Sequence, residues 1–320
     1  MQNEFTVLDV FSGAGGLSEG FFCLGFEFIS HIDKDKNALL TLETRSIYHA
    51  LSRDGMENTY FRYIRGDISR QDLLRECKLQ SEQISPGIIN IEFNSITKDK
   101  ILLEIDKCRR KSNFKNVDII IGGPPCQAYS PAGRSRDPQR MQNDTRNYLY
   151  RYYLGIIKSF KPAIFVFENV PGMKSAKGGD IFNNFKTEAR DYGYVVEDKL
   201  LDAQNFFVLQ KRERLIIIGW RSEYDLMYPL FAPKEHDYAV SSLLDDLPPL
   251  IPGEGSEGPQ NYRSRPSEYL KKAKIRSDKD VLIQHNARNH NERDRTIYRR
   301  AIETWNNEHR RIRYNELPEE

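Results

Sequence analysis

The sequence predicts an α/β fold: a doubly wound, mostly parallel sheet over residues 1–225, then a partial, irregular region over residues 226–320. Three observations predict it. Short apolar runs recur through the first part of the chain, and each is followed by polar residues. The first run leads through a glycine-rich turn into a helical pattern, which is how such folds begin. Prolines and glycines then cluster over residues 248–266, which indicates a linker or an irregular second region.

The first predicted strand, Thr6 to Phe11, runs directly into Ser12-Gly13-Ala14-Gly15-Gly16, and a helix is expected from Leu17. Glycines let a backbone approach a ligand closely, and a helix N-terminus presents free N–H groups. The spacing is not the G-x-G-x-x-G pattern, because Ser18 takes the place of its third glycine. Taken alone, the segment is equally well interpreted as a purely structural turn.

Two aspartates follow predicted strands in the order that a nucleoside cofactor needs. The run Phe28 to Ile32 ends at Asp33, and the run Tyr60 to Ile64 leads to Asp67. A carboxylate after the second strand can accept the ribose hydroxyls, and Asp67 is expected to accept from an adenine amino group. Each aspartate alone is more often a helix N-cap, but their order behind the glycine turn favours a cofactor crevice.

Residues 122–130 follow the apolar run Val117 to Ile121 and read Gly-Gly-Pro-Pro-Cys-Gln-Ala-Tyr-Ser. Each proline fixes its own φ and restricts its neighbour, so Cys126 is held in a defined direction. A thiol held in this way is a candidate nucleophile. The alternative is a strand-ending turn with an incidental cysteine, and the other motifs decide against it.

Two further motifs flank predicted strands. Glu168 directly follows the apolar run 163–167, at the sheet edge where such folds bind ligands. Arg212 and Arg214 precede the run 215–219 and share one face if that strand begins early. Two guanidinium groups on one face suit a phosphate, a carboxylate or a base carbonyl. The alternatives are a solvated loop carboxylate and a charged edge strand.

Together these segments resemble the C5-cytosine DNA methyltransferases over roughly residues 5–220, in the family's order. The resemblance implies a class I S-adenosylmethionine-dependent methyltransferase fold of the Rossmann-like type. It rests on five segments: Asp9 to Gly16, Gly123 to Gln127, Asp144 to Asn147, Glu168 to Val170 and Gln210 to Arg214.

The resemblance implies methyl transfer from S-adenosylmethionine to carbon 5 of a flipped cytosine in double-stranded DNA. Cys126 would add to carbon 6, and Glu168 would hold the N3 and amino edge of the base. Arg212 would contact the O2 edge, and Arg214 would order the catalytic loop. Covalent catalysis splits one difficult step into easier ones, and the target base must leave the duplex. The base that removes the carbon 5 proton is not identified by the sequence.

The resemblance also implies binding roles for further residues, and none for a metal. Expected at the cofactor are Phe11, Gly13, Gly15, Gly16, Leu17, Asp33, Asp67, Ile68, Pro125 and Leu149. Expected at the substrate are Gln127, Ser130, Asn169, Val170 and Gln210.

Three departures from the family pattern affect these expectations. Residues 206–209 are Phe-Phe-Val-Leu where relatives carry Gly-x-Pro, and Asp33 stands where some relatives have Glu. The family's later Arg-x-Leu/Thr-x-Arg-Glu and Gly-Asn-x-Val-x-Pro segments do not occur before Glu320. Two hypotheses follow: the catalytic part of a split or truncated enzyme that needs a complementing C-terminal subunit, or a module that binds DNA or a partner without turnover. A tRNA-methylating relative is a weaker third interpretation.

Composition sets the remaining limits. The formal net charge is only +2, but residues 261–320 carry an excess of Lys and Arg that can neutralise DNA phosphates. No run of about 18 apolar residues is present, which argues against a membrane span. Four cysteines without a C-x-x-C pair indicate a reduced, cytoplasmic protein. The resemblance implies that it is of bacterial type and nucleoid-associated through DNA. Helices are expected near residues 69–78, 99–110 and 294–311.

Overall fold

The computed structural model describes residues 5–76, 87–125 and 148–317. They form two compact units, and each is described by itself. The first unit comprises the chain up to residue 60 together with residues 70–238. The second comprises residues 61–69 and 239–320. The division therefore falls after residue 238, and a short internal segment belongs to the second unit.

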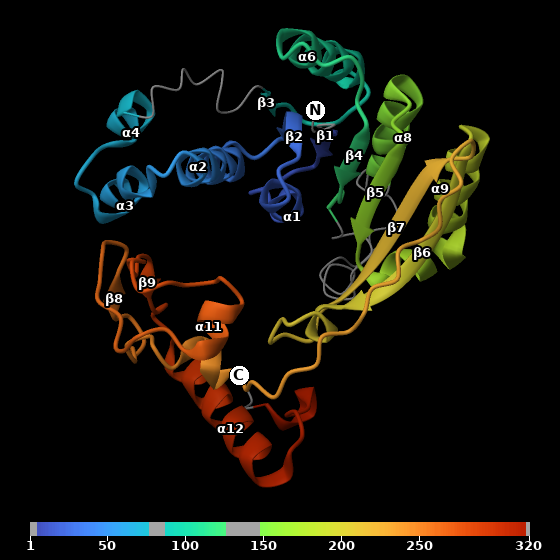
Figure 1. The fold of residues 1–320 in the computed structure, drawn as a ribbon. Coiled ribbons are helices and arrows are strands. Elements are labelled where there is room, and N and C mark those ends of the chain that lie inside the picture. Colours follow the sequence, from blue (N-terminus) through green and yellow to red (C-terminus); the bar gives the residue numbers. More distant parts are fainter. Residues whose placement is uncertain (1–4, 77–86, 126–147, 318–320) are drawn as a thin grey trace. The chain divides into compact units, whose positions relative to one another are not determined.

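A seven-stranded sheet in the order β3-β2-β1-β4-β5-β7-β6 forms the centre of the first unit (Figure 1). The five strands from β3 to β5 are parallel, whereas β7 runs antiparallel to both β5 and β6. The strands are β1 Thr6–Val10, β2 Glu27–Asp33, β3 Ile88–Asn90, β4 Ile119–Gly122, β5 Ile164–Asn169, β6 Tyr194–Asp202 and β7 Glu213–Arg221. This confirms the predicted doubly wound, mostly parallel sheet.

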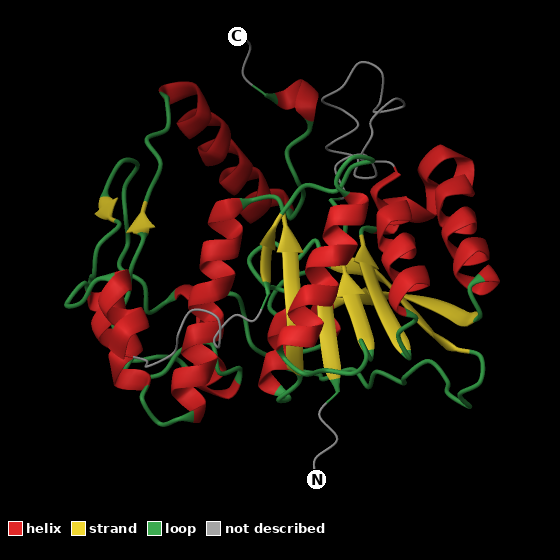
Figure 2. Ribbon diagram, turned by 90° about the horizontal axis from the view of Figure 1, so that it is seen from above, coloured by secondary structure: helices red, strands yellow, loops and turns green. Residues whose placement is uncertain are grey.

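Helices lie on both faces of this sheet (Figure 2). Alternate side chains of a strand point to opposite faces, and Leu8 of β1 belongs to the large apolar cluster with α6, α8 and α9. Val7 belongs to a smaller cluster on the other face, against which α1 packs. The helices of this part of the chain are α1 Ser18–Cys23, α2 Lys36–Arg53, α3 Glu57–Arg65, α4 Arg70–Glu76, α6 Lys98–Lys111, α8 Leu149–Phe160 and α9 Asp180–Asp191, with 3-10 helices η2 Pro171–Gly179 and η3 Ala203–Asn205.

Aromatic rings fill the large cluster. Tyr153 of α8 is fully buried, and its ring lies 5.1 Å from that of Phe167 and 6.2 Å from that of Phe165. Its hydroxyl lies 3.1 Å from the carbonyl of Ile120 and 2.9 Å from that of Val166. Burial raises the pKa of Tyr153 well above its usual range, so the group remains a neutral donor. The phenol thus links the carbonyls of two neighbouring strands, β4 and β5.

The strand predicted over residues 60–64 is wrong, because these residues lie in the helix α3. Tyr60, Phe61 and Ile64 have the i, i+1, i+4 spacing of one helical face. Glu57 in the first turn and Arg65 in the last complement the helix dipole. The third strand of the sheet is β3 instead. The helices expected near residues 69–78, 99–110 and 294–311 are confirmed as α4, α6 and α12, which spans Glu292–Glu308.

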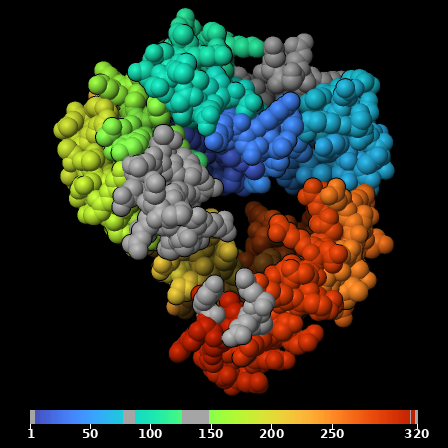
Figure 3. Space-filling model, turned by 180° about the vertical axis from the view of Figure 1, so that it is seen from behind, coloured from blue at the N-terminus to red at the C-terminus, as the bar shows by residue number. Residues whose placement is uncertain are grey.

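The second unit is largely irregular. Its elements are α10 Ser241–Leu244, β8 Gly255–Ser256, α11 Glu268–Lys272, β9 His285–Asn286, α12 Glu292–Glu308 and η4 Tyr314–Glu316. An ion pair between Arg276 and Asp246, both almost fully buried, connects two of its loops, and the Arg276 guanidinium lies 3.3 Å from the centre of the Tyr262 ring. No side chain of α12 is buried, and Trp305 is 54% exposed. In Figure 3 the C-terminal residues, coloured red, form part of the surface of this unit.

Candidate functional site

A cavity of about 500 Å³ is lined by residues at the carboxyl ends of the parallel strands, and we call it the edge cavity. Four of the residues predicted for cofactor binding line it together: Phe11, Asp33, Pro125 and Leu149. The ring of Phe93 completes one wall, with its centre 4.3 Å from that of Phe11. The carboxyl edge of a doubly wound sheet is where such folds bind their ligands. The cavity is large enough for a nucleoside-sized ligand.

The glycine turn fixes the Asp33 carboxylate at this cavity. The Gly13 N–H donates to Asp33 Oδ2 at 2.9 Å, and the Asp35 N–H donates to Oδ1 at 2.8 Å. Gly13 and Gly15 have φ values of +52° and +85°, which glycine adopts without steric cost. A carboxylate held by two backbone donors is oriented before a ligand arrives, and each oxygen retains a lone pair for a hydroxyl.

Close packing explains Gly15 and Leu17 in this turn region, but not Gly16. A Cβ at Gly15 would lie 3.3 Å from Leu42 Cγ of α2, so the turn fits tightly against that helix. Gly16 has nothing within 4 Å of its ideal Cβ position. Leu17 packs against the smaller apolar cluster with Val7 and Phe28. These residues shape the turn, and Leu17 does so from the core side.

A buried polar network lies beneath the turn. The Ser18 hydroxyl donates to Asp9 Oδ2, and His31 Nδ1 lies 3.3 Å from the same oxygen. All three side chains are almost fully buried. Ser18 begins α1, whereas Asp9 and His31 each lie two residues before a residue of the edge cavity, Phe11 and Asp33. A buried polar group must be hydrogen-bonded to avoid a large desolvation penalty, so this network holds β1, β2 and α1 in one arrangement.

The acidic and basic motifs meet at the neighbouring strand ends. Arg214 Nε of β7 lies 2.7 Å from Glu168 Oε1 of β5. This pair is about three-quarters buried, and such charge-assisted hydrogen bonds are stronger than neutral ones. A Cβ at Gly123 would lie 2.8 Å from Glu168 Oε2, so the residue after β4 is in direct contact with the carboxylate. Asn169 is fully buried and donates through Nδ2 to the Pro124 carbonyl at 3.3 Å.

These contacts bring three sequence motifs together. The segment Gly123 to Pro125 contacts Glu168 and Asn169 on one side and lines the edge cavity through Pro125 on the other. Cys126 is the next residue in the chain. Cys126, Gln127 and Ser130 lie outside the described residues. Val170 packs against the large apolar cluster, and its N–H donates to the Asn169 side chain.

The side chains of Arg212 and Gln210 make no hydrogen bond or ion pair with Glu168, Asn169 or the segment Gly123 to Pro125 in the described structure. Arg212 is exposed and lies one residue before β7, and its backbone N–H donates to Asp202 at 2.9 Å. Gln210 is also exposed, in the turn that leads to β7. Only Arg214 of the two predicted arginines therefore lies within the strand and beside Glu168.

Asp67 and Ile68 are not at a strand end. They follow the helix α3 and belong to the second unit. The end of β3 instead brings Glu92 and Phe93 to the edge cavity. Glu92 is paired with Lys34 at 2.8 Å, but both side chains are 60% exposed, so the pair is weak and its carboxylate can exchange partners.

Sequence reasoning missed Glu92 and Phe93, although a signal was present. Ile88, Ile89 and Ile91 form a short run after Pro86 and Gly87 that only Asn90 interrupts, and an acidic residue follows it. The Gly-Asp-Ile sequence at residues 66–68 also follows an apolar run, and the third strand end was therefore predicted there instead. Among the described residues, no group of His, Cys, Asp and Glu side chains could hold a metal ion.

Comparison with known proteins decides the family. The profile of the C-5 cytosine-specific DNA methylases matches residues 78–319. The chain belongs to this family. The methylase is 35% identical to the Type II methyltransferase M.Bpa9945I of Bacillus paralicheniformis, over 98% of this chain and 77% of that protein. It is 33% identical to M.BspRI of Lysinibacillus sphaericus, over 71% of this chain but only 47% of the relative.

A shorter relative matches over nearly its whole length. M.AquIA, a Type II methyltransferase of Picosynechococcus sp., is 29% identical over 78% of the methylase and 91% of its own chain. Among solved structures, a DNA modification methyltransferase encoded within an Escherichia coli prophage superposes with a TM-score of 0.58 at 21% identity, covering 93% of this chain and 74% of that one. That likeness supports the fold. Within the described part of the methylase, no helix is both long and apolar enough to cross a bilayer.

Proposed function

We propose that this methylase transfers a methyl group from S-adenosylmethionine to carbon 5 of a cytosine in duplex DNA, with Cys126 as nucleophile. One observation carries the proposal. The short segment after β4 contacts the Glu168–Arg214 pair through Gly123 and lines the edge cavity through Pro125. A nucleophile at residue 126 would therefore follow directly from the point where the acidic site and the cofactor cavity meet.

The edge cavity fits an adenosyl cofactor. The oriented carboxylate of Asp33 suits the ribose hydroxyls, and the rings of Phe11 and Phe93 suit the flat face of an adenine. Glu92 replaces Asp67 as the candidate acceptor for the adenine amino group, because Glu92 lines the cavity. When bound, S-adenosylmethionine supplies an electrophilic methyl group on a sulfonium.

The side chains of the methylase prepare the base. Carbon 5 of cytosine is not nucleophilic in the intact ring, and addition of the Cys126 thiolate to carbon 6 makes it enamine-like. Glu168 holds the N3 and amino edge and favours protonation at N3, which spreads the negative charge that develops. Arg214 orients the Glu168 carboxylate, and Arg212 is assigned to the O2 edge. Removal of the carbon 5 proton then releases the thiolate.

We assign DNA contact to the second unit and its flanking residues, because Lys and Arg outnumber acidic residues over positions 261–320. Each phosphate neutralised by such a side chain releases a counterion, so binding should weaken steeply with salt. Arg293, Arg299 and Arg300 are exposed on α12 and are the first candidates.

A second candidate function is that of a subunit that needs a complementing segment. Apolar side chains that are only half-buried on one face of the sheet favour it. Val166 of β5 and Ile216 and Ile218 of β7 alternate with core residues and are only half-buried. An apolar sheet face of this kind suits a further packed element. The alignment covers 91% of the M.AquIA chain, so at least one Type II methyltransferase chain has nearly all of its length matched within this one.

The test uses a substrate that traps the covalent intermediate, with and without an added polypeptide that carries the Gly-Asn-x-Val-x-Pro segment. Duplex DNA that contains 5-fluorocytosine should trap a covalent adduct with the wild-type protein and S-adenosylmethionine, and Cys126→Ser should trap none. Cys23→Ser is the matched control, because Cys23 is an exposed thiol on α1. An adduct in the Cys126→Ser protein would refute the assignment. If turnover appears only when a polypeptide with the Gly-Asn-x-Val-x-Pro segment is added, the subunit hypothesis holds.

A further inference from the structure

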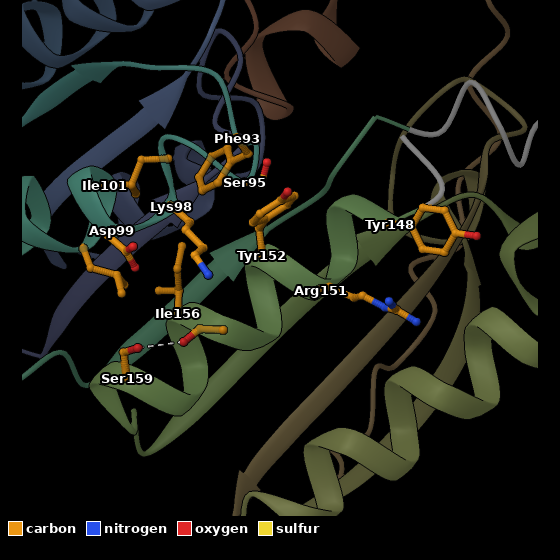
Figure 4. Close-up of a pocket in the computed structure, with 12 residues that line it drawn as sticks. Phe93, Ser95, Lys98, Asp99, Ile101, Tyr148, Arg151, Tyr152, Ile156 and Ser159 are labelled. Atoms are coloured by element: carbon orange, nitrogen blue, oxygen red, sulfur yellow. Dashed lines mark hydrogen bonds between the residues drawn. The ribbon is translucent and has the colours of Figure 1, made fainter. Parts of the chain in front are cut away.

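A second cavity, of about 490 Å³, lies between α6 and α8, and we call it the side chamber (Figure 4). Its floor is apolar, with Ile101 and Ile156 almost fully buried and Leu102 beside them. Nothing in the proposed methyl transfer uses these residues. A largely apolar cavity of this size with a few polar groups at its rim has the character of a ligand site.

The side chamber adjoins the edge cavity. Phe93, Ser95, Tyr148 and Tyr152 line both cavities. The rings of Phe93 and Tyr152 lie 6.3 Å apart and are tilted by 42°, so two aromatic side chains form the partition. Phe93 also contacts Phe11 on the side of the edge cavity. A ligand in one cavity therefore meets the same rings as a ligand in the other.

The side chamber is kept open by a glycine. Gly155 lines the chamber from α8, and an ideal Cβ at this position would meet nothing within 4 Å. A side chain there would start in open space, and because Gly155 lines the chamber a larger one would occupy part of it. The Ser159 hydroxyl is not available to donate to a ligand, because it already donates to the Gly155 carbonyl at 2.9 Å.

One cation is available at the rim. In Figure 4 the Lys98 side chain extends from α6 toward α8, whereas Arg151 points away from the chamber. Arg151 stacks on the Tyr148 ring at 5.0 Å. Lys98 is exposed, and its side chain has no hydrogen bond or ion pair among the described residues. Its ammonium is therefore free to meet an acceptor at the outer end of a ligand.

The part of the cofactor nearest the side chamber follows from the order of groups along the edge cavity. The ribose belongs at Asp33, and the methionine end must lie toward the glycine turn and Pro125, because the methyl group has to reach the base beside Cys126. The adenine then takes the remaining end, at Phe93 and Glu92. Phe93, at that end, is also part of the wall that the edge cavity shares with the side chamber.

We propose that the side chamber is a subsite for a flat, apolar substituent carried on the exocyclic nitrogen of the adenine, with an acceptor group at its outer end. The inference rests on the proposed function, since it requires an adenosyl ligand in the edge cavity. The exocyclic nitrogen is the attachment point because Glu92, which lines the edge cavity, directly precedes Phe93 of the shared wall. An adenine substituted on that nitrogen keeps one N–H, which the Glu92 carboxylate can accept. The methylase would thereby accept enlarged adenosyl ligands that a closed adenine pocket excludes.

Calorimetric titration of the full chain tests this, with S-adenosylhomocysteine and its N6-benzyl derivative as probes. Burial of a phenyl ring should make the benzyl compound about tenfold tighter than the parent. Gly155→Leu should abolish that gain and leave the parent affinity within about twofold, whereas Gly155→Ala should keep most of the gain. The benzyl compound binding more weakly than the parent to the wild type would overturn the subsite, and so would an equal loss of both ligands in Gly155→Leu.

A second arm tests the rim. An N6-(4-carboxybenzyl) derivative should bind about threefold tighter than the benzyl compound, and Lys98→Met should remove that advantage. Lys100→Met is the matched control, because Lys100 is exposed on the same turn but does not line the chamber. No difference between the two substitutions would overturn the role of Lys98. Failure of S-adenosylhomocysteine itself to bind would refute the proposed function. Binding of S-adenosylhomocysteine without binding of its N6 derivatives would refute the subsite alone.

Discussion

Gly123 is the position at which a single methyl group should separate catalysis from cofactor binding. In Gly123→Ala, the new Cβ would lie 2.8 Å from Glu168 Oε2 and 3.0 Å from the Glu168 carbonyl oxygen. Both distances are shorter than an ordinary contact, so the carboxylate must move by several tenths of an ångström. The movement should break or lengthen the 2.7 Å contact between Glu168 and Arg214 Nε.

The size of the effect follows from that one contact. A hydrogen bond to a charged group contributes about 1.5–3 kcal/mol. A loss of about 2 kcal/mol in the transition state corresponds to a roughly thirtyfold lower kcat. The affinity for S-adenosylhomocysteine should change by less than about threefold, because the residues assigned to the ribose and the adenine, Asp33, Phe11 and Phe93, lie outside the segment after β4, which contributes Pro125 to the cavity.

The assay is transfer of a tritiated methyl group to mixed-sequence duplex DNA, with the complementing segment supplied, beside calorimetry of cofactor binding. Gly20→Ala is the matched control, because its Cβ meets nothing within 4 Å and alanine favours the helix α1. An unchanged kcat in Gly123→Ala would refute the argument that the position of Glu168 limits the reaction. An equal loss in both variants would show a general effect of the added methyl group.

Three further predictions follow from other contacts. Cys126→Ser should abolish methyl transfer while cofactor affinity, measured by calorimetry, stays within about twofold, and a large loss of affinity would contradict the role of nucleophile. Asp33→Ala should weaken S-adenosylhomocysteine by at least about tenfold, because the carboxylate fixed by the Gly13 N–H is lost, and unchanged binding would remove Asp33 from the ribose site. Arg276→Met should lower the stability of the chain by about 3 kcal/mol, because Asp246 is left as a buried, unpaired charge; thermal unfolding measures this, and the double variant with Asp246→Leu should recover most of the loss.

Four of the five parallel strands, β1, β2, β4 and β5, were predictable from the sequence because each is a short, largely apolar run that leads into a turn or a polar residue. Val117 to Ile121 and Ala163 to Phe167 gave the positions of β4 and β5 to within about two residues, since β4 spans Ile119–Gly122 and β5 spans Ile164–Asn169. The meeting of Gly123 with Glu168 could be expected as well, because parallel neighbours end at the same edge.

The failure at residues 60–64 has a physical cause. Tyr60, Phe61 and Ile64 satisfy both the composition of a strand and the spacing of a helix, and the acidic and basic ends of α3 decide for the helix. β3 was not predicted because it is only three residues long and is an edge strand that pairs with β2 alone. The side chamber could not be predicted at all, because it depends on how α6 and α8 pack.

The two tryptophans of the sequence are divided between the two units. Trp220 lies in β7 and is 3% exposed, whereas Trp305 lies on α12 and is 54% exposed. Each unit therefore carries its own fluorescent reporter, one in an apolar environment and one largely in water. With Trp305→Phe the emission would follow the sheet alone, and with Trp220→Phe it would follow α12 alone. Superimposable denaturation curves from the two single-tryptophan proteins would mean that the units unfold as one cooperative system, and separated curves would measure the free energy that couples them.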